Sequence, residues 1–270
     1  MPSIDAARRR LRLADSHVSV LGLLVEGEEL PDELSQPLAE LQEAGIVDSE
    51  RAISADLFSL VSTLLEPHVI VRAEVTGPQG MVNSGAVIGG DFMFTHEGWL
   101  GEEESEYVPV EPPMLVWALS RMVDLHSDIS DASDMSEEIV STMGVLDGLL
   151  TRVESGDRQE FSEAAEAIGA PQRLAELLAQ LNCMWRMTVV WRGRESRDGE
   201  MEVSALAVWD CGLEGYWIRE SPAEPVREGE VDEHSELRVR RTTAKELWQK
   251  VTDLLPDGDQ LLVEDPSSLG

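Results

Sequence analysis

The residues best suited to acid–base or nucleophilic chemistry are scattered along the chain. The five histidines are His17, His68, His96, His126 and His234. None stands at a recognisable spacing from an Asp and a Ser or Cys, as the elements of a hydrolase triad would. The glycine-rich stretches 77–80 and 85–90 match neither a phosphate-binding loop nor a dinucleotide fingerprint. The sequence therefore predicts a protein that is not an enzyme.

Metal and cofactor sites are not indicated either. Cys183 and Cys211 are the only cysteines, and they form no Cys-x-x-Cys pair that would suggest zinc. The aspartates of residues 126–134 are spaced somewhat like a calcium loop but lack its glycine and its terminal glutamate. We therefore expect no cofactor and no metal.

Charge and hydropathy narrow the choice of partner and compartment. Acidic residues number 53 against 21 basic ones, a net charge of −32. Such a surface repels nucleic acid, and the basic runs 8–12 and 238–241 are short. Self-repulsion favours a monomer or a weak homodimer. The first residues lack the apolar core of a signal peptide, and no apolar run approaches about 18 residues, so we expect a cytoplasmic protein without a membrane span.

Tryptophan is the residue type that points to a binding surface. The chain has seven Trp but two Tyr and four Phe. Trp185, Trp191 and Trp248 lie on apolar stripes and are expected in the core. In the strand expected at 215–218, consecutive side chains point to opposite faces, so at least one aromatic ring should face outward. Trp and Tyr are enriched in interface hot spots. The predicted partner-binding residues are Trp209, Tyr216, Trp217 and Ile218.

The elements that would position these residues occur twice. Helical spacing, alternation and turn residues predict an α-β-β-β-β-α order in both halves of the chain. The first set is a helix at 54–65, strands at 69–75, 82–88, 92–94 and 107–110, and a helix at 112–125. The second set is a helix at 174–181, strands at 185–191, 201–210, 215–218 and 237–239, and a helix at 243–255. This predicts an α+β fold with internal duplication, antiparallel sheet or sheets, helices on one face and pseudo-two-fold symmetry.

The polar stretch 126–134 would separate the two units, 1–126 and 135–270, within one composite domain. Residues 1–12 are expected to be frayed and residues 135–153 helical. Residues 18–25 fit a strand or a short buried helix, and the acidic run 102–106 is expected to be a solvated loop.

Three segments of the chain carry a family resemblance: residues 37–47 (PLAELQEAGIV) with the helix and strand that follow, 208–216 (VWDCGLEGY) and 239–248 (VRRTTAKELW). They resemble the EspG family, the cytosolic chaperones of type VII (ESX) secretion in actinobacteria. The third resembles the family's final strand and helix. In the second, Gly215 is followed directly by Tyr216, without the family's intervening Arg. The resemblance implies binding of a helical secretion substrate of the PE-PPE or WXG type, whose tip the chaperone masks, and no catalysis.

Two other functions remain open. An acidic inhibitor or immunity-type protein that covers a basic enzyme would agree with the charge, and its affinity would depend strongly on salt. An unrecognised enzyme would show a deep pocket with convergent polar groups.

The sequence also predicts the effect of one substitution. Charge reversal on the outward face of residues 215–218 should weaken the complex without unfolding the protein, as measured by binding and thermal denaturation. Unchanged affinity would argue against that site.

Overall fold

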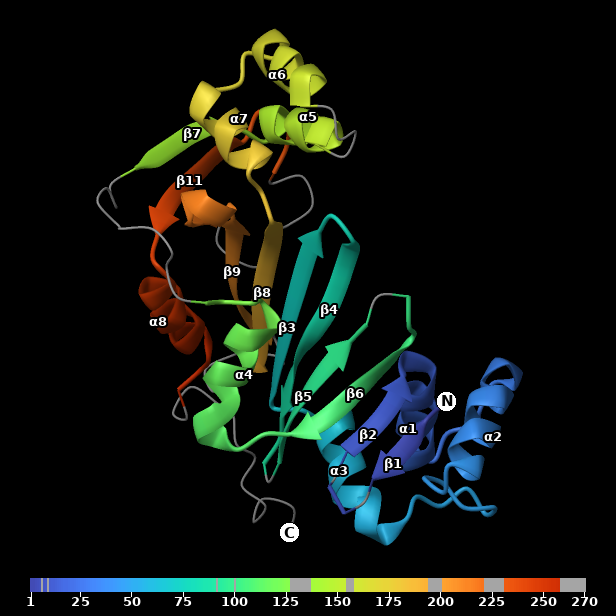
Figure 1. Cartoon of the computed structure of the whole chain (residues 1–270). Coiled ribbons are helices and arrows are strands. Elements are labelled where there is room, and N and C mark those ends of the chain that lie inside the picture. The colour runs from blue at the N-terminus through green and yellow to red at the C-terminus, as the bar shows by residue number, and fades with distance from the viewer. Residues whose placement is uncertain are drawn as a thin grey trace.

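The computed structural model describes residues 1–257 except 6, 9, 91, 100, 127–136, 154–157, 194–200 and 221–230. Its centre is one antiparallel sheet with the strand order β1-β2-β6-β5-β4-β3-β8-β9-β10-β11-β7 (Figure 1). The described strands are β1 (Ser3–Asp5), β2 (Arg10–Ala14), β3 (Val69–Gly77), β4 (Gly80–Ile88), β5 (Met93–Gly98), β6 (Glu104–Pro109), β7 (Glu138–Thr142), β8 (Cys183–Arg192), β9 (Met201–Asp210), β10 (Tyr216–Arg219) and β11 (Glu236–Thr242). The α+β fold class predicted from the sequence is thereby confirmed.

Helices surround this sheet on both sides. The described α-helices are α1 (Asp15–Glu26), α2 (Ser35–Glu43), α3 (Ala55–Leu65), α4 (Leu115–Met122), α5 (Met143–Val153), α6 (Arg158–Ala167), α7 (Gln172–Ala179) and α8 (Ala244–Leu254). The described 3-10 turns are η1 (Asp32–Leu34), η2 (Pro112–Met114) and η4 (Gly212–Glu214).

The two halves of the chain meet where β3 pairs with β8. In the register of this pair, Val71 stands opposite Val189 and Ala73 opposite Met187. All four side chains are fully buried. The alternation of apolar residues in both strands therefore places matching apolar rows on the same face. The sequence left open whether the halves form one sheet or two, and the structure shows one.

The order of strands is the same on both sides of this joint. Outward from β3 come β4, β5, β6 and β2, and outward from β8 come β9, β10, β11 and β7. In each half a group of helices precedes the inner strand, and one helix, α4 or α8, ends the series. A duplicated chain would have this order. Duplication itself, and the division into units 1–126 and 135–270, remain predictions.

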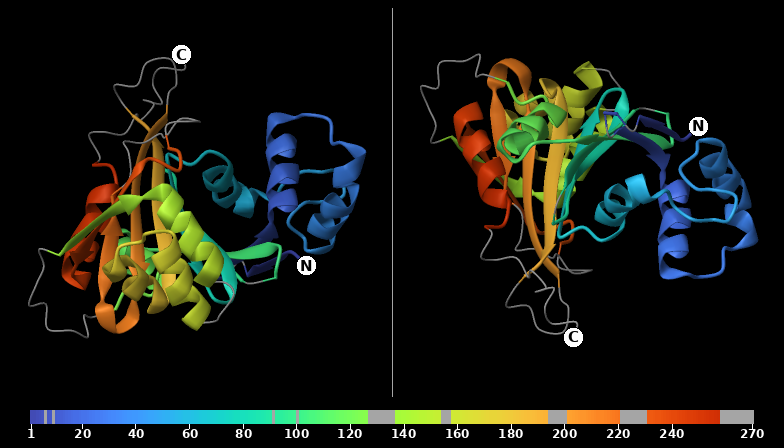
Figure 2. Two further views of the ribbon diagram at one scale, coloured as in Figure 1. Left: turned by 90° about the horizontal axis from the view of Figure 1, so that it is seen from above. Right: turned by 90° about the horizontal axis from the view of Figure 1, so that it is seen from below.

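Helices cover both faces of the sheet, not one as the sequence suggested. On the first face, α4 and α8 pack on the central strands around buried residues such as Trp185 and Leu247. We call the other side the cap face, because α1–α3 form an N-terminal cap and α5–α7 a C-terminal cap on it. In both views of Figure 2, α8 lies on one side of the central strands and α1 and α2 lie on the other. Because successive side chains of a strand point to opposite faces, the sheet contributes residues to a separate core on each face.

The N-terminal segment is ordered as β1 and β2 at the edge of the sheet, so the expectation of a frayed end at residues 1–12 was wrong. Leu11 and Leu13 are buried against the N-terminal cap. Arg12, on the other face of β2, forms ion pairs with Glu102 and Glu104. Since Glu104 lies in β6, the acidic run is not simply a solvated loop.

Two other boundaries differ from the sequence prediction. Residues 138–142 form β7 instead of the start of a helix, because Ile139 is buried beside Val239 of β11. The ambiguous stretch 18–25 belongs to helix α1, which ends at Gly27 with a φ of 72°. A glycine suits this left-handed helix end. Most of the predicted boundary at 126–134 lies outside the described residues.

A substitution in β4 tests how closely the strands pack. A Cβ added at Gly85 would lie 2.0 Å from the carbonyl oxygen of Val71, a backbone atom that cannot move aside. We expect Gly85→Ala to lower the free energy of unfolding by about 1–3 kcal/mol because of this overpacking. Gly90→Ala is the matched control, since its Cβ would approach His68 only to 3.8 Å. Equal denaturation midpoints for both variants would contradict the packing of β4.

Candidate partner-binding surface

Between the two caps, none of the described helices lies on the cap face of the middle of the sheet. Val69, Val71 and Ala73 of β3 belong to the core under α4 and α8, so the residues between them point to the cap face. The same alternation holds in β8 and β9. We call the resulting set the sheet floor: Ile70, Arg72, Glu74, Arg186, Thr188, Val190, Val203, Ala205 and Ala207.

The exposure of its side chains indicates that the sheet floor is accessible to solvent. Ile70 is 39% exposed although it lies on a central strand. Arg72 is exposed, and the floor residues of β8 and β9 are half-buried. None of the apolar floor residues belongs to a core cluster of the described chain. A contiguous strip of uncovered strands in the middle of a protein is a typical place for a partner to bind.

Small side chains line the floor along β9. Ala207 stands between Arg186 of β8 and Arg219 of β10 in one row across the strands. Ala205 faces Thr188 in the next row. Adjacent strands are about 4.8 Å apart, so the two arginine backbones lie roughly 10 Å from each other. The small side chains of Ala205 and Ala207 therefore lie lower than the long side chains beside them, and we call this strip of β9 the trough.

A cavity of about 640 Å³ adjoins the floor on the side of the N-terminal cap. Arg72 and Glu74 line it from the floor, and Asp15, His96 and Tyr107 line it from α1, β5 and β6. Burial lowers the pKa of His96 and raises the pKa of Tyr107, so both rings are uncharged near pH 7. Their ring centres are 5.5 Å apart. Among the described residues no Ser or Cys is hydrogen-bonded to His96, so the cavity does not contain a nucleophile–base pair of the kind a hydrolase uses.

The four residues predicted from the sequence to bind the partner are all buried. Tyr216 and Ile218 lie under α4 and α8, and Trp209 and Trp217 lie under the C-terminal cap. The expectation that at least one ring of this strand faces outward was wrong, because helices cover both faces of β10. Charge reversal here is therefore expected to unfold the protein, and direct contact between these side chains and a partner is not supported.

Residues that the sequence reading did not single out form the surface instead. The floor residues Arg72, Arg186 and Ala205 occupy the polar or small positions of strands that were predicted correctly. Their alternation with buried residues was visible in the sequence. What the sequence did not show is which cap-face positions remain uncovered by helices.

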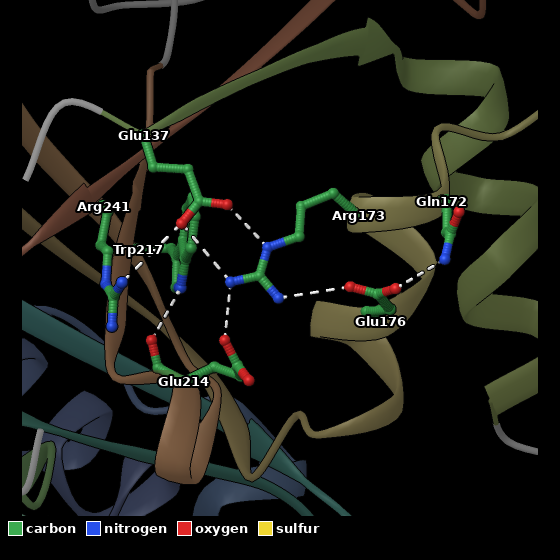
Figure 3. Close-up of polar contacts among 7 residues, drawn as sticks. All are labelled: Glu137, Gln172, Arg173, Glu176, Glu214, Trp217 and Arg241. Carbon is green, nitrogen blue, oxygen red and sulfur yellow. Dashed lines mark hydrogen bonds and ion pairs between the residues drawn. The ribbon is translucent and has the colours of Figure 1, made fainter. Parts of the chain in front are cut away.

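An ion-pair cluster holds the turn between β9 and β10 beside the C-terminal cap (Figure 3). Arg173 of α7 donates hydrogen bonds to Glu137 and Glu214, each at 2.6 Å, and its guanidinium lies 5.7 Å from the centre of the Trp217 ring. The hydrogen bond from Arg173 to Glu137 is the main reason that the pKa of Arg173 is raised. The turn that this cluster fixes presents Leu213 with 76% of its surface exposed.

Other candidates for chemistry do not form a site. Burial raises the pKa of Cys183 to about 11 and that of Cys211 to about 12, so both thiols are protonated and unreactive at neutral pH. In the part of the chain that the structure describes, His, Cys, Asp and Glu form no group of three or more suited to a metal ion. No described helix has the length and apolarity required to span a membrane.

Removing the centre of the ion-pair cluster should destabilise the fold. We expect Arg173→Met, which keeps the apolar stem beside Trp217, to lower the free energy of unfolding by about 1–2 kcal/mol, because Glu137 and Glu214 both lose a charged donor. The value is at the low end since 31% of the Arg173 side chain is exposed and solvent screens the pairs. The control is Arg8→Met, whose partner Asp5 is well exposed, and denaturation should show little change. An equal effect of both variants would contradict the role of the cluster.

Comparison with known proteins gives a structural match but no sequence match. No family model matches the chain, and no curated protein matches it either. The fold is similar to that of the Mycobacterium tuberculosis type VII secretion system chaperone EspG5, solved in complex with the PE25–PPE41 dimer. The TM-score is 0.54 and the identity 14%, and the match covers 94% of this chain and 100% of the other. At this level of identity the likeness shows that the chain has an EspG-like fold.

Proposed function

We propose that this protein is a binding protein of the chaperone type, which holds a helical protein destined for type VII secretion and has no catalytic role. The proposal is supported by the EspG-like fold, since the similar structure is that of a chaperone in complex with a PE–PPE dimer. The sequence resemblance described above implies the same partner class. In this reading the partner is held in the cytoplasm and its helical tip is masked before secretion.

The observation that carries the proposal is the uncovered sheet floor between the two caps. Helix α5 contacts β7 and β11, α3 contacts β4, and the C-terminal cap reaches β9 at Trp209, next to the last residue of that strand. A helical hairpin end laid on the floor would bury Ile70, Val190 and Val203 without displacing either cap. The floor thus fits a helix-in-groove mode of recognition, in which an apolar helical stripe gives affinity and the rim gives specificity.

The trough along β9 gives a direct test. Ala205→Gln places a long neutral side chain in the trough, so we expect affinity for the partner to fall at least about tenfold, since a poorly packed helix loses more than 1.4 kcal/mol. The fold should be unaffected because Ala205 is half-buried and belongs to no core cluster. The assay is co-expression with the PE–PPE or WXG-type proteins encoded beside this chain, followed by size-exclusion chromatography and titration calorimetry.

The matched control is Val140→Gln, which makes a similar polar change at an exposed position of the edge strand β7, outside the floor. It should bind like the wild type. Equal affinities for the wild type and both variants would place the partner elsewhere. Failure of the folded wild type to form a complex with any of these proteins would refute the proposed partner class.

A further inference from the structure

The charge of the sheet floor is opposite to that of the rest of the protein. The whole chain carries 53 acidic and 21 basic residues. On the cap face of the central strands, by contrast, the charged residues are Arg72, Arg186, Arg192 and Arg219, with Glu74 as the one acid among the described residues. A cationic strip of this kind within an acidic surface favours a partner group of negative charge.

Two of these arginines have no carboxylate partner in the described part of the chain. Arg72 forms no ion pair with a described residue, although it lines the cavity beside His96 together with the acidic residues Asp15, Glu74, Glu102 and Glu103. The guanidinium of Arg219 donates only to the sulfur of Met143, at 3.6 Å. Asp147 acts on Arg219 through its field but forms no hydrogen bond or ion pair with it.

Arg219 is already partly removed from water. Burial lowers its pKa, and the positive charge of Arg186 across Ala207 lowers it further. The guanidinium nevertheless stays charged, as arginine does in proteins. Covering such a cation with an apolar surface that offers no acceptor would be strongly unfavourable. A partner that covers the floor must therefore bring acceptors to it.

We propose that the occupant of the trough is an α-helix of the partner that lays an apolar stripe on Val203 and Ala205 and carries Asp or Glu on its flanks, opposite Arg219 and Arg72. This inference rests on the proposed function and specifies the chemistry of the partner at the same surface. The spacing agrees with it, because β3 and β10 are three strands apart, roughly 14 Å, so a helix of about 10–12 Å diameter that lies along β9 passes between Arg72 and Arg219. The acidic remainder of the surface repels the partner's carboxylates, so a helix with acidic flanks is favoured at the floor over other places on the protein.

The test uses the full chain and the PE–PPE or WXG-type protein that binds it. Arg219→Gln and Arg72→Gln should each weaken binding at least about tenfold, because each removes a charge-assisted contact. Both should also make the affinity less sensitive to salt. Arg121→Gln is the control: it makes the same change of net charge on α4, outside the cap face, and should bind like the wild type.

Charge exchange supplies the second readout. Arg219→Glu should abolish binding, and an Asp or Glu to Lys change on the flank of the partner helix should restore it. Since Arg219 forms no ion pair with any residue that the structure describes, thermal denaturation should be unchanged in Arg219→Gln. Arg72→Gln, at an exposed site, keeps the test valid if Arg219→Gln does not fold.

The outcomes separate the two proposals. If Ala205→Gln prevents binding while both arginine variants bind like the wild type, the floor is the binding site but the acidic helix is refuted. If both arginine variants weaken binding but no partner substitution restores Arg219→Glu, the carboxylate partner is likewise refuted. If the folded wild type binds none of these proteins, both proposals fail together.

Discussion

The pairing of β3 with β8 is the interaction on which the rest of the structure depends. It joins two half-sheets that would otherwise each end in a bare, apolar edge strand, a form prone to non-specific association. It also places the two helical caps at a distance from each other, since each cap packs over the outer strands of its own half. The sheet floor between the caps is a direct consequence, and the candidate binding surface would not exist without this joint.

The sequence predicted the positions of most helices and strands, but not which of them would pack together. Strict alternation in β3 and β8, and helical spacing in α3, α7 and α8, were sufficient to locate them. The short edge strands were missed, because β7 has a single buried residue, Ile139, between the exposed neighbours Glu138 and Val140. Such a strand is defined by the partner it pairs with, β11, and a local pattern does not contain that information.

The residues predicted to bind a partner were expected to be exposed but are buried, for a related reason. Trp217 was correctly seen as a large aromatic on a strand, but its exposure depends on whether α5–α7 cover that face. The buried Trp217 instead stabilises the C-terminal cap through Arg173. The surface that remains uncovered includes small residues such as Ala205 and Ala207. They matter because they are small and because no cap covers them. No composition or motif argument identifies such residues before the helices are placed.

A structure of this chain in complex with a PE–PPE or WXG-type protein would test the central claim most directly. The account predicts a partner helix on the cap face, lying along β9 between the two caps and within contact distance of Ala205. A partner seated on α4 and α8, or on the outer surface of either cap with the sheet floor still open to solvent, would contradict it.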